Sequence, residues 1–188
     1  MQIVEYHLPN LDYDTLKALE PTNDSYVSVF NKTSNQYEDK MIYRKYKSYG
    51  ISPTFKETNK SFMFNCQSLE IPKELEPYLQ FAQSMDKGYN NCYVNWYDSG
   101  ENYIEPHSDC NDQLVHNSMI IIINLNEGQY ERSFKIQHKD DCGDIKEIKL
   151  KHGHCLMFNS AEQTHYRHWV DKEDTKEGRI SVTLRMIK

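Results

Sequence analysis

The segment from Asn95 to Asp109 constrains this chain more than any other, because it carries two metal-binding side chains two residues apart. In an extended chain, residues i and i+2 point to the same face, so His107 and Asp109 can reach one ion together. A third ligand must come from elsewhere, and the segment 164–170 offers imidazoles. Two histidines and one carboxylate leave coordination positions open, an arrangement typical of ferrous iron that binds an organic co-substrate and dioxygen.

The third ligand has more than one candidate by spacing alone. His165 and His168 lie an odd number of residues apart, so a regular strand turns them to opposite faces and periodicity does not choose between them. His152 and His154 flank a glycine ahead of an apolar run, which favours a structural role for both. The spacing therefore predicts a site with His107, Asp109 and one of two later histidines.

Two further pairs of residues share a face in extended chain. Asn95 and Tyr97 are two residues apart, and Arg179 and Arg185 are six apart in the C-terminal run. Guanidinium groups bind carboxylates through a matched fork of donors. Two arginines, a tyrosine and an asparagine facing one pocket therefore predict an acidic co-substrate, a small dicarboxylate, beside the metal.

In these features the sequence resembles the AlkB-type dioxygenases that depend on ferrous iron and 2-oxoglutarate. The resembling pieces occur in this order: Asn95-Trp96-Tyr97 with Gly100, His107-Ser108-Asp109, the segment 154–159, His165-Tyr166-Arg167-His168, and Arg179 through Arg185. A weaker likeness lies at 44–50, like the segment that precedes the substrate lid in repair members, and with it the resemblance covers roughly the last three-quarters of the chain. An HxD motif alone is weak, but HxD, a late histidine and two arginines six apart form a strong pattern.

The resemblance implies a role for each of these residues. It makes His168 the distal metal ligand, because an apolar pair follows it and Arg179 lies about ten residues on, and it leaves His165 to packing. It assigns Arg179 to the distal carboxylate of 2-oxoglutarate, with hydrogen bonds from Tyr97 and Asn95. Arg185 serves either the iron-side carboxylate or Asp109.

One position of the co-substrate set departs from the family pattern. The family usually has asparagine two residues after the first arginine, where this chain has Ser181. The change weakens one contact to the co-substrate but removes no charge partner. Ser181 therefore stays in the predicted set.

The implied reaction is oxidative demethylation of N-alkylated nucleobases in DNA or RNA, with release of formaldehyde, succinate and CO2. In repair members, aromatic side chains of the lid stack on a base displaced from its helix or presented on a single strand. Candidates of that kind are Tyr46, Tyr49, Phe62 and Phe64, although the phenylalanines are equally suited to a core. Arg44, within a basic cluster of the lid region, and Asp112, just after the HxD motif, complete the predicted substrate-binding residues.

The charge of the chain limits the choice of substrate. Its formal net charge is −6, and nucleic-acid binding relies on lysine and arginine at phosphates. The acidic segment 171–174 further disfavours long duplexes, so the sequence favours single-stranded alkylated nucleic acid as partner. The alternative keeps the iron chemistry and changes the substrate to a protein, lipid or small molecule. A binding module without turnover is disfavoured, since it has no need of all five metal and arginine residues.

Composition indicates an intracellular protein. The longest isoleucine-rich run, 119–123, is too short to span a membrane, and the N-terminus lacks the pattern of a signal peptide. Five cysteines form no CxxC pair, which favours a reducing compartment. We therefore expect a monomer in the cytoplasm or nucleus, without a membrane partner.

The expected fold is mainly β with some helix (α+β), a double-stranded β-helix or jelly roll. From Cys92 onward, short apolar segments alternate with polar turns, and we predict strands near 92–97, 102–107, 118–124, 131–138, 145–150, 154–159, 165–170 and 179–187. Eight strands suit a jelly roll of two stacked sheets. We expect one domain over 1–188, with an N-terminal extension and substrate lid over 1–70, a supporting helix within 71–91 that runs from about Lys73 to Met85, and the jelly-roll core over 92–188. A shorter helix, capped by Asp14, should precede Pro21.

Overall fold

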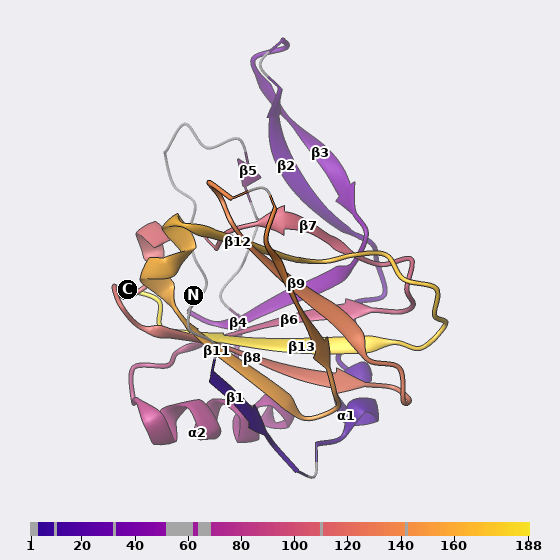
Figure 1. Ribbon diagram of the computed structural model, residues 1–188, viewed down its shortest axis with the longest axis vertical. Helices are drawn as coiled ribbons and strands as arrows, with labels where there is room; N and C mark the ends of the chain where they lie inside the picture. The colour runs from indigo at the N-terminus through magenta and orange to yellow at the C-terminus, as the bar shows by residue number, and fades with distance from the viewer. Residues whose placement is uncertain are drawn as a thin grey trace.

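The computed structural model describes residues 4–9, 11–31, 33–51, 62–63, 69–109, 111–141 and 143–188. Two antiparallel sheets form the body of the molecule, and a hairpin projects from it (Figure 1). The large sheet contains, in spatial order, β1 (Val4–His7), β11 (His154–Asn159), β8 (Met119–Asn126), β13 (Arg179–Arg185), β6 (Asn91–Tyr97) and β4 (Lys45–Gly50). The small sheet contains β10 (Ile145–Leu150), β9 (Arg132–His138), β12 (Tyr166–Val170) and β7 (Ile104–His107).

The jelly-roll prediction is confirmed. The predicted strands appear within about two residues of their expected bounds, and they divide equally, with β6, β8, β11 and β13 in one sheet and β7, β9, β10 and β12 in the other. The first 70 residues do more than the expected extension and lid, because β1 and β4 join the two edges of the large sheet. β4 thereby lies directly beside β6, which holds Asn95 and Tyr97.

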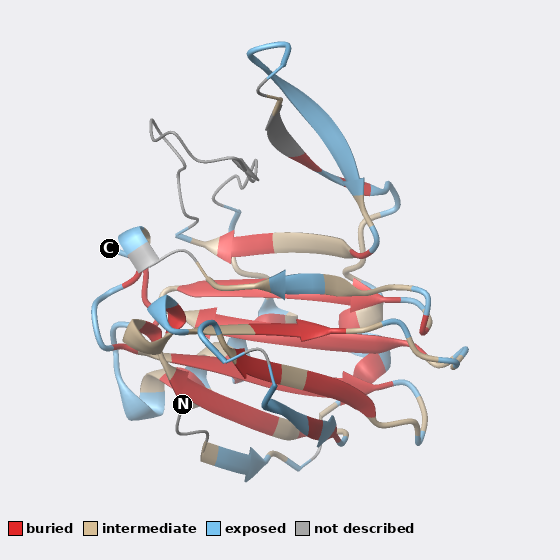
Figure 2. Cartoon of the chain, turned by 45° about the horizontal axis from the view of Figure 1, so that its top comes forward, coloured by how far each residue is buried: buried red, intermediate tan, exposed pale blue. Residues whose placement is uncertain are grey.

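A third sheet forms the projecting hairpin. It contains β3 (Gln36–Ile42), β2 (Ser25–Asn31) and β5 (Phe62–Met63). Figure 2 shows that β3 is exposed along most of its length, in contrast to the buried strands of the body. The sequence does not predict β3, because its polar residues give no apolar alternation.

Helices cover the outer face of the large sheet. They are α1 (Tyr13–Lys17), the 3-10 turn η1 (Lys73–Leu75) and α2 (Glu76–Met85), whose apolar residues pack on Val94, Trp96 and their neighbours. The prediction of a helix from Lys73 to Met85 is met by η1 and α2 together. The prediction that Asp14 caps the first helix is wrong: Asp12 has extended backbone angles, and its side chain accepts from the Asp14 amide at 3.1 Å.

A second core fills the space between the two sheets. Ile120 and Ile122 of β8 meet Phe134 and Ile136 of β9, whereas the alternate residues of β8 face the helices. Because strand side chains alternate, each strand of the large sheet sends one set of residues outward to the helices and the other inward. The inward set includes the candidate site.

The described part of the chain also contains two further 3-10 turns and two buried cysteines. Short 3-10 turns lie at η2 (Asn111–Gln113) and η3 (Ser160–Thr164), just after the HxD motif and just before β12. Cys92 and Cys155 are buried free thiols. No helix in the described ranges is long and apolar enough to cross a membrane.

Candidate active site

The structure brings His107, Asp109 and His168 together between the two sheets. β7 ends at His107, and β12 pairs with it so that His168 lies opposite His107 in the register. Ligand atoms of all three residues lie within 4.8 Å of one another, and no other group of three metal-binding residues occurs in the described part of the chain. His165 caps η3 outside β12 and stacks on His138, away from this cluster.

The Asp109 carboxylate lies close enough to each histidine for the two residues to share one metal ion. Asp109 Oδ1 lies 3.8 Å from His107 Nε2 and 3.9 Å from His168 Nε2. Two ligands that each bind one ion at about 2.1 Å cannot be more than roughly 4.2 Å apart, and both distances meet that limit. His107 Nδ1 lies 2.8 Å from the Glu105 carbonyl oxygen, and donating a proton there leaves Nε2 free to bind a metal.

Asp109 is held by a charged partner on its second oxygen. Arg185 donates to Asp109 Oδ2 from Nε at 2.9 Å and from Nη2 at 2.7 Å. Burial raises the pKa of the Asp109 carboxyl, but neighbouring charges, that of Arg185 first, outweigh it and bring the pKa to about 2. Of the two partners considered for Arg185, the structure shows Asp109.

Both histidines of the triad are held in the neutral form that a metal requires. Burial lowers the pKa of His168 to about 3, and the nearby charges of His107 and Arg185 act in the same direction. Burial is also the main cause of a lowered pKa at His107, to which Arg44 and Arg185 contribute. The two imidazoles are therefore ready to bind a cation at neutral pH.

The predicted co-substrate residues lie on the same inner face, along β6 and β13. Arg179 is opposite Tyr97, and Ser181 is opposite Asn95. The guanidinium of Arg179 lies over the Tyr97 ring, with Cζ 4.8 Å from the ring centroid. Asn95 Nδ2 lies 3.4 Å from Ser181 Oγ. Four of the five predicted residues, Asn95, Tyr97, Arg179 and Ser181, thus form one continuous buried patch, and Arg185 joins it to the triad.

Arg179 has the character of an anion-binding group. It is 2% exposed, and among the described residues its Nη1 has no hydrogen-bond partner. A buried cation without a carboxylate partner is costly unless a ligand supplies the charge. The patch therefore fits the acidic co-substrate that the sequence predicted.

The predicted substrate residues are divided by the structure. Arg44 is 8% exposed and donates from Nε to Asn95 Oδ1 at 2.9 Å, so it belongs to the inner patch rather than to a lid. Tyr49 lies in the outer core with the helices, away from the triad. Asp112 is exposed on η2. Phe62 lies in β5 but its side chain is outside the described residues, as is the whole of Phe64.

The inner face also carries a stacked pair of tyrosines, which the sequence alone does not distinguish from the other aromatic residues nearby. Tyr46 stacks on Tyr93, with ring centroids 5.5 Å apart and planes inclined by 13°. Arg185 lies over the Tyr93 ring, with Cζ 5.2 Å from its centroid. Tyr46, and not Tyr49, is therefore the β4 tyrosine that faces the triad side. The register of β4 on β6 decides this, and no local pattern reveals it.

Two buried polar residues were missed altogether. Arg132 is 1% exposed and donates to the carbonyl oxygens of Ser99, Asn102 and Asp171, so it joins the two loops beside Tyr97. Asn124 is fully buried and contacts Arg179. The available signal for Asn124 was a polar residue interrupting the isoleucine-rich β8.

The jelly roll and the triad define the class of this protein. It belongs to the 2OG-Fe(II) oxygenase superfamily, whose family model matches residues 12–185. The predicted dependence on Fe(II), 2-oxoglutarate and dioxygen is confirmed by this membership.

One sequence relative supports the predicted AlkB-type resemblance, and two solved structures support the fold. The chain is 26% identical over 147 residues to "DNA oxidative demethylase ALKBH2" of Bos taurus, covering 71% of this chain and 51% of that protein, about half its length. The structure of OsALKBH1 matches with a TM-score of 0.56 at 14% identity, covering 97% of both chains. A prolyl-4-hydroxylase of Pseudomonas putida matches with a TM-score of 0.57 at 15% identity, covering 99% of this chain and 92% of that one. The two structural matches speak for the fold alone.

Proposed function

We propose that this protein is an oxidative demethylase of N-alkylated nucleobases in DNA or RNA, with single strands preferred, and that it releases formaldehyde, succinate and CO2. The sequence similarity to a DNA oxidative demethylase supports this substrate class. The single structural observation that carries it is the stacked pair of Tyr46 and Tyr93, which lies on the inner face next to Arg185. A flat aromatic surface near the metal ligands suits a planar base, because bases stack on aromatic rings.

In this proposal His107, Asp109 and His168 hold the iron. Bound iron, with 2-oxoglutarate and dioxygen, supplies the oxidising chemistry. The protein keeps the His168 imidazole neutral by burial, and Arg185 holds the second oxygen of Asp109 so that only Oδ1 faces the metal position. The ligand set is thereby preorganised before any substrate arrives.

The inner patch binds and orients the co-substrate. Arg179 and the Tyr97 beside it take the distal carboxylate, while Asn95 and Ser181 line the path from there toward the triad. Arg44 contributes a further buried guanidinium to the patch, where it contacts Asn95. In the described part of the chain, Arg44 forms no ion pair with a carboxylate. The patch thus offers positive charge to a dianion and, being buried, keeps water from it.

The experiment that tests the proposal measures formaldehyde release with ferrous iron, 2-oxoglutarate, ascorbate and air. Oligonucleotides with N1-methyladenine or N3-methylcytosine are compared with unmethylated ones, as single strands and as duplexes. We expect formaldehyde from the methylated oligonucleotides alone, more from single strands. His107→Ala should abolish it, whereas His154→Ala, a histidine that pairs with Glu5 on the opposite edge strand, should retain it.

A second candidate changes the substrate to a protein or small molecule. The net charge of −6 and the acidic residues Glu38 and Asp39 of the exposed β3 favour it, because they repel phosphates. Succinate formation without formaldehyde from any oligonucleotide would support this candidate and reject the nucleobase proposal.

A further inference from the structure

Asn124 contacts Arg179, the residue assigned to the distal carboxylate of the co-substrate. The proposed function gives Asn124 no role of its own. Its Oδ1 accepts a hydrogen bond from Arg179 Nε at 2.6 Å, and both residues are almost completely buried. Asn124 lies on β8, the strand on the other side of β13 from β6. Arg179 is therefore held from one side by Asn124 and covered by the Tyr97 ring from the other strand.

The amide of Asn124 can face Arg179 in one way only. Its Nδ2 donates to Asn126 Oδ1 at 2.8 Å, to the Lys151 carbonyl oxygen at 2.9 Å and to the Leu150 carbonyl oxygen at 3.3 Å. Turning the amide over would place a donor against the guanidinium and an acceptor against three acceptors. The end of β10 thus fixes the oxygen of Asn124 on Arg179.

A neutral partner leaves the charge of Arg179 available. Asn124 satisfies Nε, while Nη1 is buried and has no partner among the described residues. No ion pair in the described part of the chain includes Arg179; the other arginines of the site, Arg132 and Arg185, have Glu173 and Asp109 within reach. A carboxylate at position 124 would neutralise the charge of Arg179. An apolar residue there would remove the hydrogen bond that orients the guanidinium.

We propose that Asn124 is a positioning residue, which orients Arg179 toward the distal carboxylate of the co-substrate and so makes the site selective for a dicarboxylate. This inference rests on the assignment of Arg179 given under the proposed function. It concerns binding at the end of the co-substrate away from the metal, and it is independent of which molecule is oxidised.

The test is a binding measurement without turnover. Manganese-loaded protein is titrated calorimetrically with 2-oxoglutarate and with 2-oxovalerate, which has the same metal-side group but no distal carboxylate. The wild type should bind 2-oxoglutarate more tightly. In Asn124→Leu and Asn124→Asp, we expect 2-oxoglutarate to bind about tenfold to a hundredfold more weakly, the range for a hydrogen bond to a charged group. The affinity for 2-oxovalerate should not change.

The matched control is Asn91→Ala. Asn91 is as fully buried as Asn124 and likewise donates from Nδ2 to backbone carbonyl oxygens, those of Tyr49 and Ile51, but it makes no hydrogen bond to Arg179 or to Asn124. It should keep the preference for 2-oxoglutarate, even where unfolding shows lower stability. Equal weakening of both ligands in the Asn124 variants, or no weakening, would overturn the proposal. If the wild type bound 2-oxoglutarate and 2-oxovalerate equally, the assignment of Arg179 to the distal carboxylate would be wrong, and the proposal for Asn124 would fail with it. The formaldehyde assay decides the nucleobase proposal separately.

Discussion

Arg185 and Asp109 form a two-point contact in which one oxygen of the carboxylate is fully engaged and the other faces two imidazoles. The two residues are 76 positions apart in the chain. Arg185 is the last residue of β13 in the large sheet, and the HxD motif begins at His107, the last residue of β7 in the small sheet. The contact therefore joins the two sheets at the candidate metal position.

Loss of this contact should weaken metal binding. In Arg185→Met, Asp109 loses its strongest favourable charge, so its pKa should rise from about 2 and its oxygens should become free to rotate. We expect manganese affinity to fall about 10- to 100-fold, as for other residues that orient metal ligands, measured by calorimetry. Arg167→Met, which removes an arginine bound to Gln137, is the control and should leave the affinity near that of the wild type. Unchanged affinity in Arg185→Met would contradict this role.

The metal-free protein should lose stability in acid because of His168. Its pKa is lowered from 6.5 to about 3 by burial, so between these values the folded state binds fewer protons than the unfolded state. The free energy of unfolding must then decrease as the pH falls through this window, by about 2 kcal/mol between pH 7 and pH 5 for this group. Urea unfolding at several pH values, in the presence of a chelator that removes metal, measures this decrease in the free energy of unfolding. His168→Gln should reduce the slope, and an identical slope would show that another group is responsible.

A close backbone approach at Gly100 should make this position intolerant of any side chain. A Cβ there would lie 1.7 Å from the Glu173 carbonyl oxygen, and the two loops exchange hydrogen bonds from Gly100 to Thr175 and from Glu173 to Gly100. Gly100→Ala should cost about 2 kcal/mol or more in the free energy of unfolding, a cost typical of overpacking. The affinity for 2-oxoglutarate should fall with it, because these loops lead to Tyr97 and Arg179.

Gly143→Ala is the matched control for Gly100. The nearest atom to a Cβ at Gly143 is Asp141 Oδ1 at 3.5 Å, an ordinary contact. Urea unfolding should find this variant within about 0.5 kcal/mol of the wild type, as for most surface substitutions. Equal losses in the two variants would mean that the contact between the loops has no special cost.

The sequence predicted those parts of the site that depend on spacing within one strand. Asn95 and Tyr97 are two residues apart, and Arg179 and Arg185 are six apart, so strand geometry alone brings each pair to one face. What it could not predict depends on register between strands. Tyr46 faces inward because it lies opposite Asn95, and Tyr49 faces the helices because it lies opposite Cys92. The same pairing of β4 with β6 brings Arg44 to Asn95, so Arg44 belongs to the inner patch and not to the predicted lid.

The fold was predictable for a related reason. The strands after Cys92 are short, apolar and separated by polar turns, so their number and order indicate a jelly roll. Such signals are weaker in the first 50 residues, and β1 and β4 join the large sheet through partners distant in the chain. Asn124 was missed since a single polar residue in a buried strand reveals its purpose only when its partner, Arg179, is known.

Tyr46 should contribute to substrate binding and not to co-substrate turnover. It stacks on Tyr93 at the inner face, and its hydroxyl donates to the Tyr26 carbonyl oxygen at the base of the projecting hairpin. Removing an aromatic ring that stacks on a base costs about 1–3 kcal/mol. Tyr46→Ala should therefore raise the KM for a methylated oligonucleotide on the order of tenfold, while succinate formation without nucleic acid stays close to that of the wild type.

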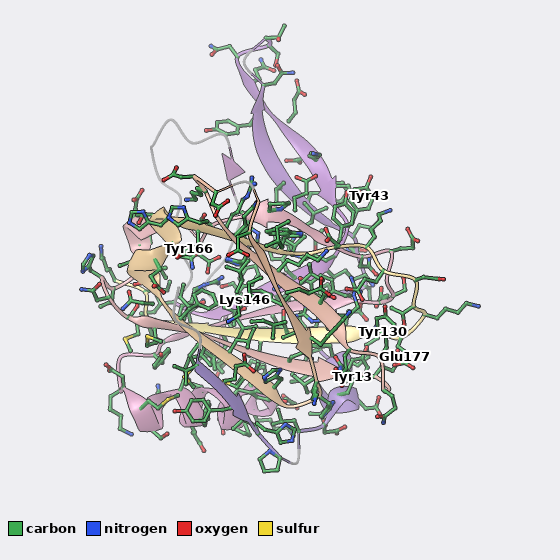
Figure 3. The ribbon with its side chains drawn as sticks, in the orientation of Figure 1. Tyr13, Tyr43, Tyr130, Lys146, Tyr166 and Glu177 are labelled. Carbon is green, nitrogen blue, oxygen red and sulfur yellow. The ribbon has the colours of Figure 1, made fainter. Side chains whose placement is uncertain are left out.

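The control for this prediction is Tyr43→Ala. Tyr43, labelled in Figure 3, is 47% exposed and stacks on Tyr103, with Lys172 over both rings, so it resembles Tyr46 in chemistry but belongs to another aromatic pair. Its removal should change the KM for the oligonucleotide by less than about twofold. If Tyr43→Ala raised that KM and Tyr46→Ala did not, the base would bind on the outer pair, beside the acidic Glu101 that Lys172 contacts. The inner stacked pair would then have a packing role only, and the nucleobase proposal would lose the observation that carries it.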